Sequence, residues 1–155
     1  MSSFLSLFGV SWDSIDKKID DEFPGISFIE GEELQVIAND DDRPVIIDVR
    51  EAKEFAVSHL PDALHIESAL AIAQALPDKE TPIVVYCSVG YRSAGVAAEL
   101  ESLGYSSARN LRHSIFAWAE QQRPLTDGQG STTSVHPYNR IWGSLVSRSL
   151  HAYEP

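Results

Sequence analysis

Cysteine is nearly absent from this chain: Cys87 is the only one among 155 residues. A single cysteine excludes an internal disulfide, and it favours a reducing compartment in which the thiol stays free. We therefore expect a cytoplasmic protein. Long apolar runs are also lacking, since no stretch approaches the ~18 residues that a membrane-spanning helix requires. The apolar start, residues 1–10, has no basic segment, which argues against a signal peptide.

Basic residues are scarce as well, because 12 Lys and Arg face 23 Asp and Glu, a net charge of −11. The excess is concentrated in residues 1–43, which hold 11 acidic and 3 basic residues, and it is densest at Asn39–Arg43. Nothing in the chain resembles a basic stripe with interleaved aromatics, so a nucleic acid is disfavoured as a ligand. We interpret the acidic run as a solvated loop, with a docking surface for a basic partner as the alternative.

The length and the hydrophobic content of 43% suit one domain with short additions at its ends. Between residues 26 and 127, short β-like runs alternate with helical patterns, which is typical of βαβ units and a parallel sheet. We expect a helical extension over residues 1–25, an α/β domain over residues 26–127, and a linker with a C-terminal amphipathic helix over residues 128–155.

The expected elements follow from hydrophobic periodicity. Strands are predicted at residues 26–29, 45–49, 64–66, 81–86 and 107–111, and helices at residues 51–59, 67–76, 92–103 and 115–122, with helical spacing also at Leu34 and Ile37. In the N-terminal extension, Ile15, Ile19 and Phe23 are four residues apart; in the C-terminal one, apolar residues recur between Ile141 and Val146. Both extensions are expected to fold back on the domain, and a partner-binding tail is the weaker alternative because so short a helix is marginal alone.

The stretch "CSVGYRS", Cys87–Ser93, lies between a predicted buried strand and a predicted helix. Backbone N–H groups at a helix start have no partners within the helix, so a curled loop directs them at the cysteine sulfur. With the positive end of the helix dipole, they form a cradle that stabilises a thiolate. The alternative is that Cys87 only fills the core, as most unpaired cysteines do.

Neighbouring residues support a chemical role. Gly90 permits the positive φ that the curl requires, Arg92 supplies a permanent cation for a substrate oxyanion, and Ser93 is placed to cap the new helix. Cys87 is therefore the candidate catalytic residue. The candidate substrate-binding residues are those of the loop: Ser88, Val89, Gly90, Tyr91, Arg92 and Ser93.

Three separated blocks resemble the single-domain rhodaneses, a family of sulfurtransferases. "VIIDVREAKEFAVSHLPDALHI" is similar to D-V-R-x-x-x-E-[FY]-x-x-G-H-I-x-G-A-x-x-I, "VVYCSVGYRSAGVAAELESLGY" to the C-x-x-G-x-R-S active loop, and "NLRHSIFAWAEQQRPL" to N-L-x-G-G-x-x-x-W. One block would be weak evidence, but three in the right order are specific. The resemblance spans residues 26–125 and implies a three-layer α/β fold, with a mostly parallel five-stranded sheet and helices on both faces.

The sequence departs from the family pattern at its glycines. Both glycines of G-H-I-x-G-A are replaced within Ser58–Ala63, and the later glycine pair is His113-Ser114. In the family that pair lies near the active site, so His113 either lines the pocket mouth and alters acceptor preference or is an exposed neighbour of a helix cap. Asp48 and Arg50 are expected beside the active loop as buried polar groups that brace loops, with direct substrate contact as the alternative and with Glu54 supporting the same network.

The resemblance implies transfer of a sulfane sulfur from a thiosulfate-like donor, through a Cys87 persulfide, to cyanide, a thiol or a protein acceptor. This chemistry requires no metal and no organic cofactor. From Cys87 to Arg92 the loop reads C-x4-R, one residue shorter than the C-x5-R of related phosphatases, which favours sulfur over phosphate. The alternatives are a sulfur-carrier or partner-docking module and, with less support, a phosphatase-like domain. Neither the physiological donor and acceptor nor the oligomeric state follows from the sequence.

Overall fold

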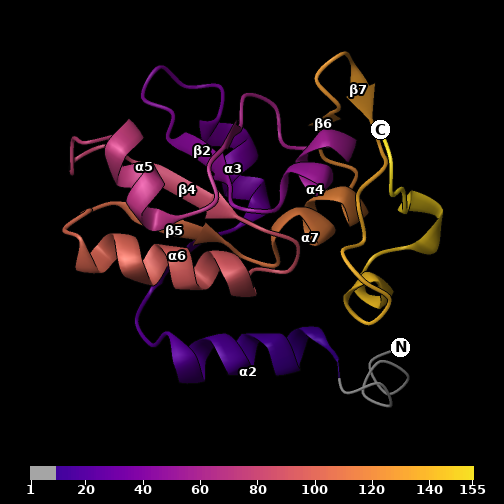
Figure 1. The fold of residues 1–155 in the computed structure, drawn as a ribbon, viewed down its shortest axis with the longest axis horizontal. Helices are drawn as coiled ribbons and strands as arrows, with labels where there is room; N and C mark the ends of the chain where they lie inside the picture. Colours follow the sequence, from indigo (N-terminus) through magenta and orange to yellow (C-terminus); the bar gives the residue numbers. More distant parts are fainter. Residues whose placement is uncertain (1–9) are drawn as a thin grey trace.

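The structure, a computed structural model, describes residues 10–155. Its centre is a five-stranded sheet of order β1-β5-β4-β2-β3 in which every neighbouring pair is parallel (Figure 1). The strands are β1 (Ser27–Ile29), β2 (Val45–Asp48), β3 (Leu64–His65), β4 (Ile83–Tyr86) and β5 (Ala108–Leu111). The predicted parallel five-stranded sheet is therefore confirmed, with strand ends within two residues of those expected.

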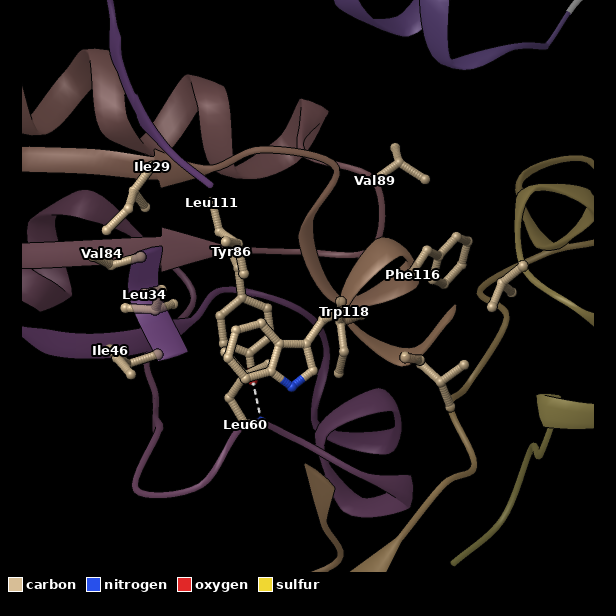
Figure 2. Close-up of a cluster of buried hydrophobic side chains, with 14 of the residues drawn as sticks. Ile29, Leu34, Ile46, Leu60, Val84, Tyr86, Val89, Leu111, Phe116 and Trp118 are labelled. Atoms are coloured by element: carbon tan, nitrogen blue, oxygen red, sulfur yellow. Dashed lines mark hydrogen bonds between the residues drawn. The ribbon is translucent and has the colours of Figure 1, made fainter. Parts of the chain in front are cut away.

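Helices cover both faces of this sheet. They are α2 (Trp12–Glu22), α3 (Gly31–Ile37), α4 (Ala52–Val57), α5 (Ala69–Ala75), α6 (Tyr91–Ser102) and α7 (Ser114–Glu120). Alternate residues of a strand point to opposite faces. Val84 and Tyr86 of β4 accordingly join the buried cluster of α3 and α7, drawn in Figure 2, whereas Ile83 and Val85 join that of α5 and α6. The expected three-layer architecture is confirmed.

The predicted N-terminal helix is present as α2. It begins at a capping box formed by Ser11 and Ser14, which satisfies backbone donors at its first turn. Ile15 and Ile19 are buried, and the helix lies alongside α6 in Figure 1. Residues 1–9 of the expected extension lie outside the described residues.

The predicted C-terminal amphipathic helix is wrong. The segment forms two short 3₁₀ helices, η1 (Trp142–Leu145) and η2 (Arg148–Leu150), joined by extended backbone. Gly143 and the serines around it have modest helix propensity, and so short a helix gains little from its own hydrogen bonds. Tertiary packing decides instead, because a Cβ on Gly143 would lie 2.9 Å from Cβ of Pro137.

The stretch expected to be a linker is a small hairpin. Strands β6 (Leu125–Thr126) and β7 (Ser131–Thr132) pair antiparallel. Between them, Oδ1 of Asp127 accepts hydrogen bonds from the N–H groups of Gln129 and Gly130, at 2.8 and 3.0 Å. The hairpin is joined to the domain by a bridge between Thr126 and His59, so the C-terminal segment leaves from a fixed point.

Candidate active site

Cys87 follows β4 directly, and its exposed fraction is 0%. Two backbone N–H groups donate to its sulfur, that of Gly90 at 3.2 Å and that of Ser93 at 3.4 Å, and the Ser93 Oγ lies 3.3 Å from it. Gly90 has φ 107°, a left-handed conformation that glycine adopts without strain, and it makes the turn into α6. The cradle expected from the sequence is therefore present, with these two N–H groups as its donors.

Two side chains that sequence reasoning missed hold the cradle in shape. Asn110 accepts a hydrogen bond from the Ser93 hydroxyl at 2.6 Å and donates one to the carbonyl of Gly90 at 3.0 Å. Ser114 accepts the N–H of Cys87 at 3.1 Å and donates to the carbonyl of Leu111 at 3.0 Å. Both are buried and reach the loop from β5 and the start of α7. Their distance from Cys87 along the chain left no local signal.

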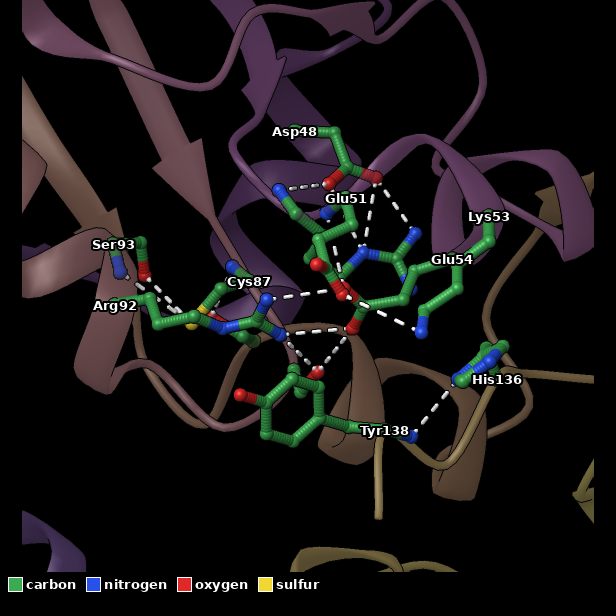
Figure 3. Close-up of polar contacts among 12 residues, drawn as sticks. Asp48, Glu51, Lys53, Glu54, Cys87, Arg92, Ser93, His136 and Tyr138 are labelled. Carbon is green, nitrogen blue, oxygen red and sulfur yellow. Dashed lines mark hydrogen bonds and ion pairs between the residues drawn. The ribbon is translucent and has the colours of Figure 1, made fainter. Parts of the chain in front are cut away.

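Arg92 lies at the rim of the cradle around the Cys87 sulfur, where it forms an ion pair with Glu54 of α4 (Figure 3). Its Nη1 and Nη2 donate to the two Glu54 carboxylate oxygens at 3.0 and 2.9 Å, and Nη2 also donates to the Ser88 hydroxyl at 2.7 Å. Burial opposes the charge of Arg92, but the hydrogen bonds to Glu54 and the nearby Cys87, Glu54 and Tyr138 together outweigh it and raise the pKa of the guanidinium. Burial also opposes the charge of the Glu54 carboxylate, but Arg92, the Glu51 N–H and Arg50 together lower its pKa.

Asp48 and Arg50 form a second, fully buried ion pair. Nη2 of Arg50 lies 2.7 Å from Oδ2 of Asp48, and both side chains have an exposed fraction of 0%. The same Nη2 donates to the carbonyl of Ser58 at 2.7 Å, which ties the end of β2 to the end of α4. The pair is buried at the end of β2 as expected, and its hydrogen bonds brace the connection between β2 and α4.

The remaining candidate residues divide into buried and rim positions. Ser88, Val89 and Gly90 are buried, and Val89 belongs to the same apolar cluster as Phe116 (Figure 2). Tyr91 is partly exposed at the start of α6. Ser93 does not cap that helix as expected, because Gly90 occupies the N-cap position and the Ser93 hydroxyl turns inward to Asn110 and the sulfur.

His113 is neither a free lining residue of the pocket nor an exposed neighbour of a cap, because it is itself the N-cap residue of α7. Its ring contacts that of Trp12 of α2, with centroids 4.2 Å apart and the planes tilted by 30°, and its Nε2 lies 3.0 Å from Oδ1 of Asp16. His113 and Ser114 have φ of 58° and 46°. These left-handed conformations are the reason why glycine suits these positions.

The C-terminal segment reaches the rim, a contact that the sequence did not reveal. The ring of Tyr138 lies 4.3 Å from the guanidinium carbon of Arg92, a cation–π contact. Trp142 is close to both Tyr138 and Tyr91, with ring centroids 6.0 and 6.3 Å apart. Figure 3 shows Tyr138 against Arg92, with His136 beside Lys53 of α4.

Comparison with known proteins identifies the domain. The sequence model of the rhodanese-like domain family matches residues 31–121. A sulfurtransferase of Allochromatium vinosum is 32% identical over 106 residues, which are 68% of this chain and 99% of that protein. The chain belongs to the rhodanese-like family. The resemblance of its three sequence blocks is thereby confirmed, and sulfur transfer is the activity that the family supports.

Solved rhodanese-like structures agree. The human single-domain sulfurtransferase is 32% identical, with a TM-score of 0.54 over 63% of this chain and 98% of that one. A thiosulfate sulfurtransferase from Pseudomonas aeruginosa shares the fold with a TM-score of 0.64, at 22% identity over 81% of this chain and 25% of that one. Other relatives are longer: the chain spans 24% of an adenylyltransferase and sulfurtransferase of Candida albicans.

Two further properties of this rhodanese-like chain bear on its site. A pocket of about 390 Å³ lies near the start of β2, lined among others by Arg43, Ile46, Leu60 and Trp118. It is at the opposite end of the parallel strands from Cys87 and contains no cysteine, so we assign the chemistry to the Cys87 loop. Within residues 10–155, no group of three His, Cys, Asp or Glu is arranged to hold a metal ion, and no helix is long and apolar enough to cross a membrane.

Proposed function

We propose that this protein transfers a sulfane sulfur from thiosulfate or a similar anion to a thiophilic acceptor through a persulfide on Cys87. The observation that carries this proposal is the convergence of two backbone N–H donors on the Cys87 sulfur, at 3.2 and 3.4 Å, within a C-x4-R loop. Such donors stabilise negative charge on sulfur in a site from which water is excluded. Membership of the family supports sulfur transfer, and we propose in addition a thiosulfate-like donor and a persulfide on Cys87.

The first step is a nucleophilic displacement. The Cys87 thiolate attacks the outer sulfur of thiosulfate and forms an S–S bond, while the bond to the sulfonate sulfur breaks and sulfite leaves with the electron pair. In the second step the acceptor, a thiolate or cyanide, attacks the outer sulfur of the persulfide. The bond to Cys87 then breaks and returns the thiolate. Neither step requires an external oxidant or reductant.

The surrounding residues have separate tasks in this scheme. The N–H groups of Gly90 and Ser93 hold the anionic sulfur in both states of the cycle. Arg92 adds positive charge at the rim, but its guanidinium is shared with Glu54, so it also fixes the loop through Ser88. Asn110 accepts the proton of the Ser93 hydroxyl and donates to the Gly90 carbonyl, so it fixes the loop that carries the two N–H donors and acts as a positioning residue.

Mass spectrometry of the intact protein tests the proposal. Incubation with thiosulfate should add about 32 Da, one sulfur atom, and later addition of cyanide should remove it with release of thiocyanate. The Cys87→Ser variant should fold normally and gain no mass. A wild-type protein with a free thiol that gains no sulfur would contradict the proposal, and Cys87-dependent hydrolysis of an aryl phosphate would favour the phosphatase alternative.

A further inference from the structure

The active loop of this protein is almost fully enclosed. Cys87, Ser88 and Val89 each have an exposed fraction of 0%, and Gly90 is buried with them. The nucleophile must nevertheless meet an anionic donor and then an acceptor. What encloses the loop therefore decides which molecules reach it.

Segments outside the family match contribute to the enclosure. The match covers residues 31–121, and the small relative from Allochromatium vinosum is spanned almost completely by 68% of this chain. On one flank α2 approaches the loop. Glu22 accepts a hydrogen bond from the Tyr91 hydroxyl at 2.6 Å, and the ring of Phe23 lies 6.0 Å from that of Tyr91.

On the other flank, residues 136–150 form what we call the aromatic cap. Tyr138 covers the guanidinium of Arg92, and Trp142 stands between Tyr138 and Tyr91. Leu145 and Val146 are buried in the same apolar cluster as Val89 of the active loop. The cap therefore adjoins both the charged rim and the apolar side of the loop.

The base of the cap is closed on itself and fastened to the domain. Val135, just before the cap, donates to the carbonyl of Leu150 at 2.8 Å, and its own carbonyl accepts the N–H of Ala152 at 3.0 Å, so the two ends of the cap are joined. Near its end, the N–H and hydroxyl of Ser147 bind the carboxylate of Glu120 at 2.7 and 2.8 Å. The side chain of Tyr138 is less restrained, with an exposed fraction of 36%. Rotating this side chain therefore costs much less free energy than detaching the whole cap from the domain.

We propose that the aromatic cap favours small or unstructured sulfur acceptors, namely low-molecular-weight thiols, flexible peptides and nucleophiles of the size of cyanide, over thiols on folded proteins. The proposal rests on the sulfur-transfer function above. An acceptor must come within bonding distance of the outer sulfur, which lies only about 2 Å beyond the Cys87 sulfur. A small thiol needs only side-chain rotations at the rim, which take place in picoseconds to nanoseconds. A folded protein brings its whole surface and requires the cap to leave.

The size of the discrimination follows from the population of the open state. Minor states a few kcal/mol above the ground state are populated at roughly 0.1–10%. A reaction that uses only the open state is slowed by that fraction, so we expect a folded-protein thiol to react on the order of 10- to 1,000-fold more slowly than the same thiol on a short peptide.

A single-turnover experiment tests the proposal. The Cys87 persulfide is formed with thiosulfate, the excess donor is removed, and loss of the added sulfur is followed by quenching and mass spectrometry. The acceptors are glutathione, a short unstructured peptide with one cysteine, and a folded protein that exposes a cysteine in the same local sequence. The wild-type protein should react with the first two acceptors and slowly with the third.

Variants of the cap make the test specific. The Tyr138→Ala/Trp142→Ala double variant should raise the ratio of protein rate to peptide rate roughly tenfold or more, towards unity. Ile141→Ala is the matched control, because Ile141 lies in the cap with an exposed fraction of 54%, and it should leave the ratio unchanged. Equal peptide and protein rates in the wild type, or an unaltered ratio in the double variant, would overturn the proposal. If no persulfide forms at the outset, the proposed function itself is wrong.

Discussion

Both carboxylate oxygens of Glu54 accept hydrogen bonds from the guanidinium of Arg92, at 2.9 and 3.0 Å. The two residues are 38 positions apart in the chain, and their pairing joins α4 to the active loop. Glu54 is fully buried and Arg92 is about one quarter exposed. The pair therefore fixes the loop more firmly than an ion pair on the surface would, since a two-pronged geometry and partial burial both strengthen the contact.

Glu54→Gln should destabilise the protein by about 2 to 4 kcal/mol, because it leaves the Arg92 charge without its partner in a partly buried site. The loop should also loosen, so persulfide formation should slow. Chemical denaturation and the rate of mass gain with thiosulfate measure the two effects. Glu99→Gln, at an exposed position on α6, is the control and should change stability by less than about 0.5 kcal/mol. Equal stability of the two variants would show that the pair contributes little.

Ser93→Ala should slow persulfide formation roughly 3- to 10-fold, less than the loss of an oxyanion-hole donor, because both N–H donors to the sulfur remain and only the contact to Asn110 that holds the loop is lost. The variant removes the hydroxyl that lies 3.3 Å from the Cys87 sulfur and 2.6 Å from Asn110. Ser102→Ala, at an exposed position on the same helix, should react as the wild type does. If Ser93→Ala reacts as fast as the wild type, the Ser93 hydroxyl does not help to shape the cradle.

Two substitutions at position 114 distinguish the effect of backbone strain from the effect of lost hydrogen bonds. Ser114→Ala and Ser114→Gly both lose the contacts to Cys87 N–H and to the Leu111 carbonyl, so both should be less stable than the wild type. Only glycine is free of strain at φ 46°, so Ser114→Gly should be more stable than Ser114→Ala by about 1 kcal/mol. Thermal or chemical unfolding of the pair gives this difference directly, and the reverse order would contradict the strain argument.

The positions of the strands along the chain, their parallel pairing and the cradle at Cys87 were predictable because each leaves a local pattern. Short β-like runs that alternate with helical patterns predict parallel strands, and a strand followed by C-x-x-G-x-R-S predicts the cradle. The bracing of the cradle was not predictable in this way. Asn110 and Ser114 reach the loop from positions 17 and 27 residues away from their partners, and only the three-dimensional arrangement brings them there.

The sequence also did not reveal the backbone conformation at positions where the family's glycines are replaced. Asp62, His113 and Ser114 stand where the family pattern has glycine, yet all three keep positive φ, at 64°, 58° and 46°. The backbone conformation is thus preserved although the residue that adopts it most easily is gone. His113 has a compensating contact with Trp12 of α2, which lies outside the family match. The helix predicted in the C-terminal segment is wrong for a different reason. Leu145 and Val146 are buried, as their helical spacing suggested, but packing rather than helix propensity determines their backbone conformation.

The stability of the cap should depend on pH through His136, which is 4% exposed. Its Nδ1 accepts the N–H of Tyr138 at 3.0 Å, so protonation of the ring removes that contact. Burial is the main cause that lowers the pKa of His136, Lys53 and Arg50 of the neighbouring elements act in the same direction, and Glu54 and Glu51 oppose them. Because the unfolded chain then binds the proton more tightly, stability is complete above pH ~6.5 and is lost as the pH falls towards the lowered folded value.

His136→Asn isolates this effect, since an asparagine oxygen can accept the same N–H without titrating. Between pH 7 and pH 5 the wild type should lose stability relative to His136→Asn, with a slope of at most about 1.4 kcal/mol per pH unit. All other histidines and carboxylates are common to both proteins, so their titration cancels in the difference. The ratio of folded-protein to peptide transfer should rise over the same range in the wild type alone, because the cap loses a contact at its base. Parallel stability curves for the two proteins would show that His136 does not hold the cap.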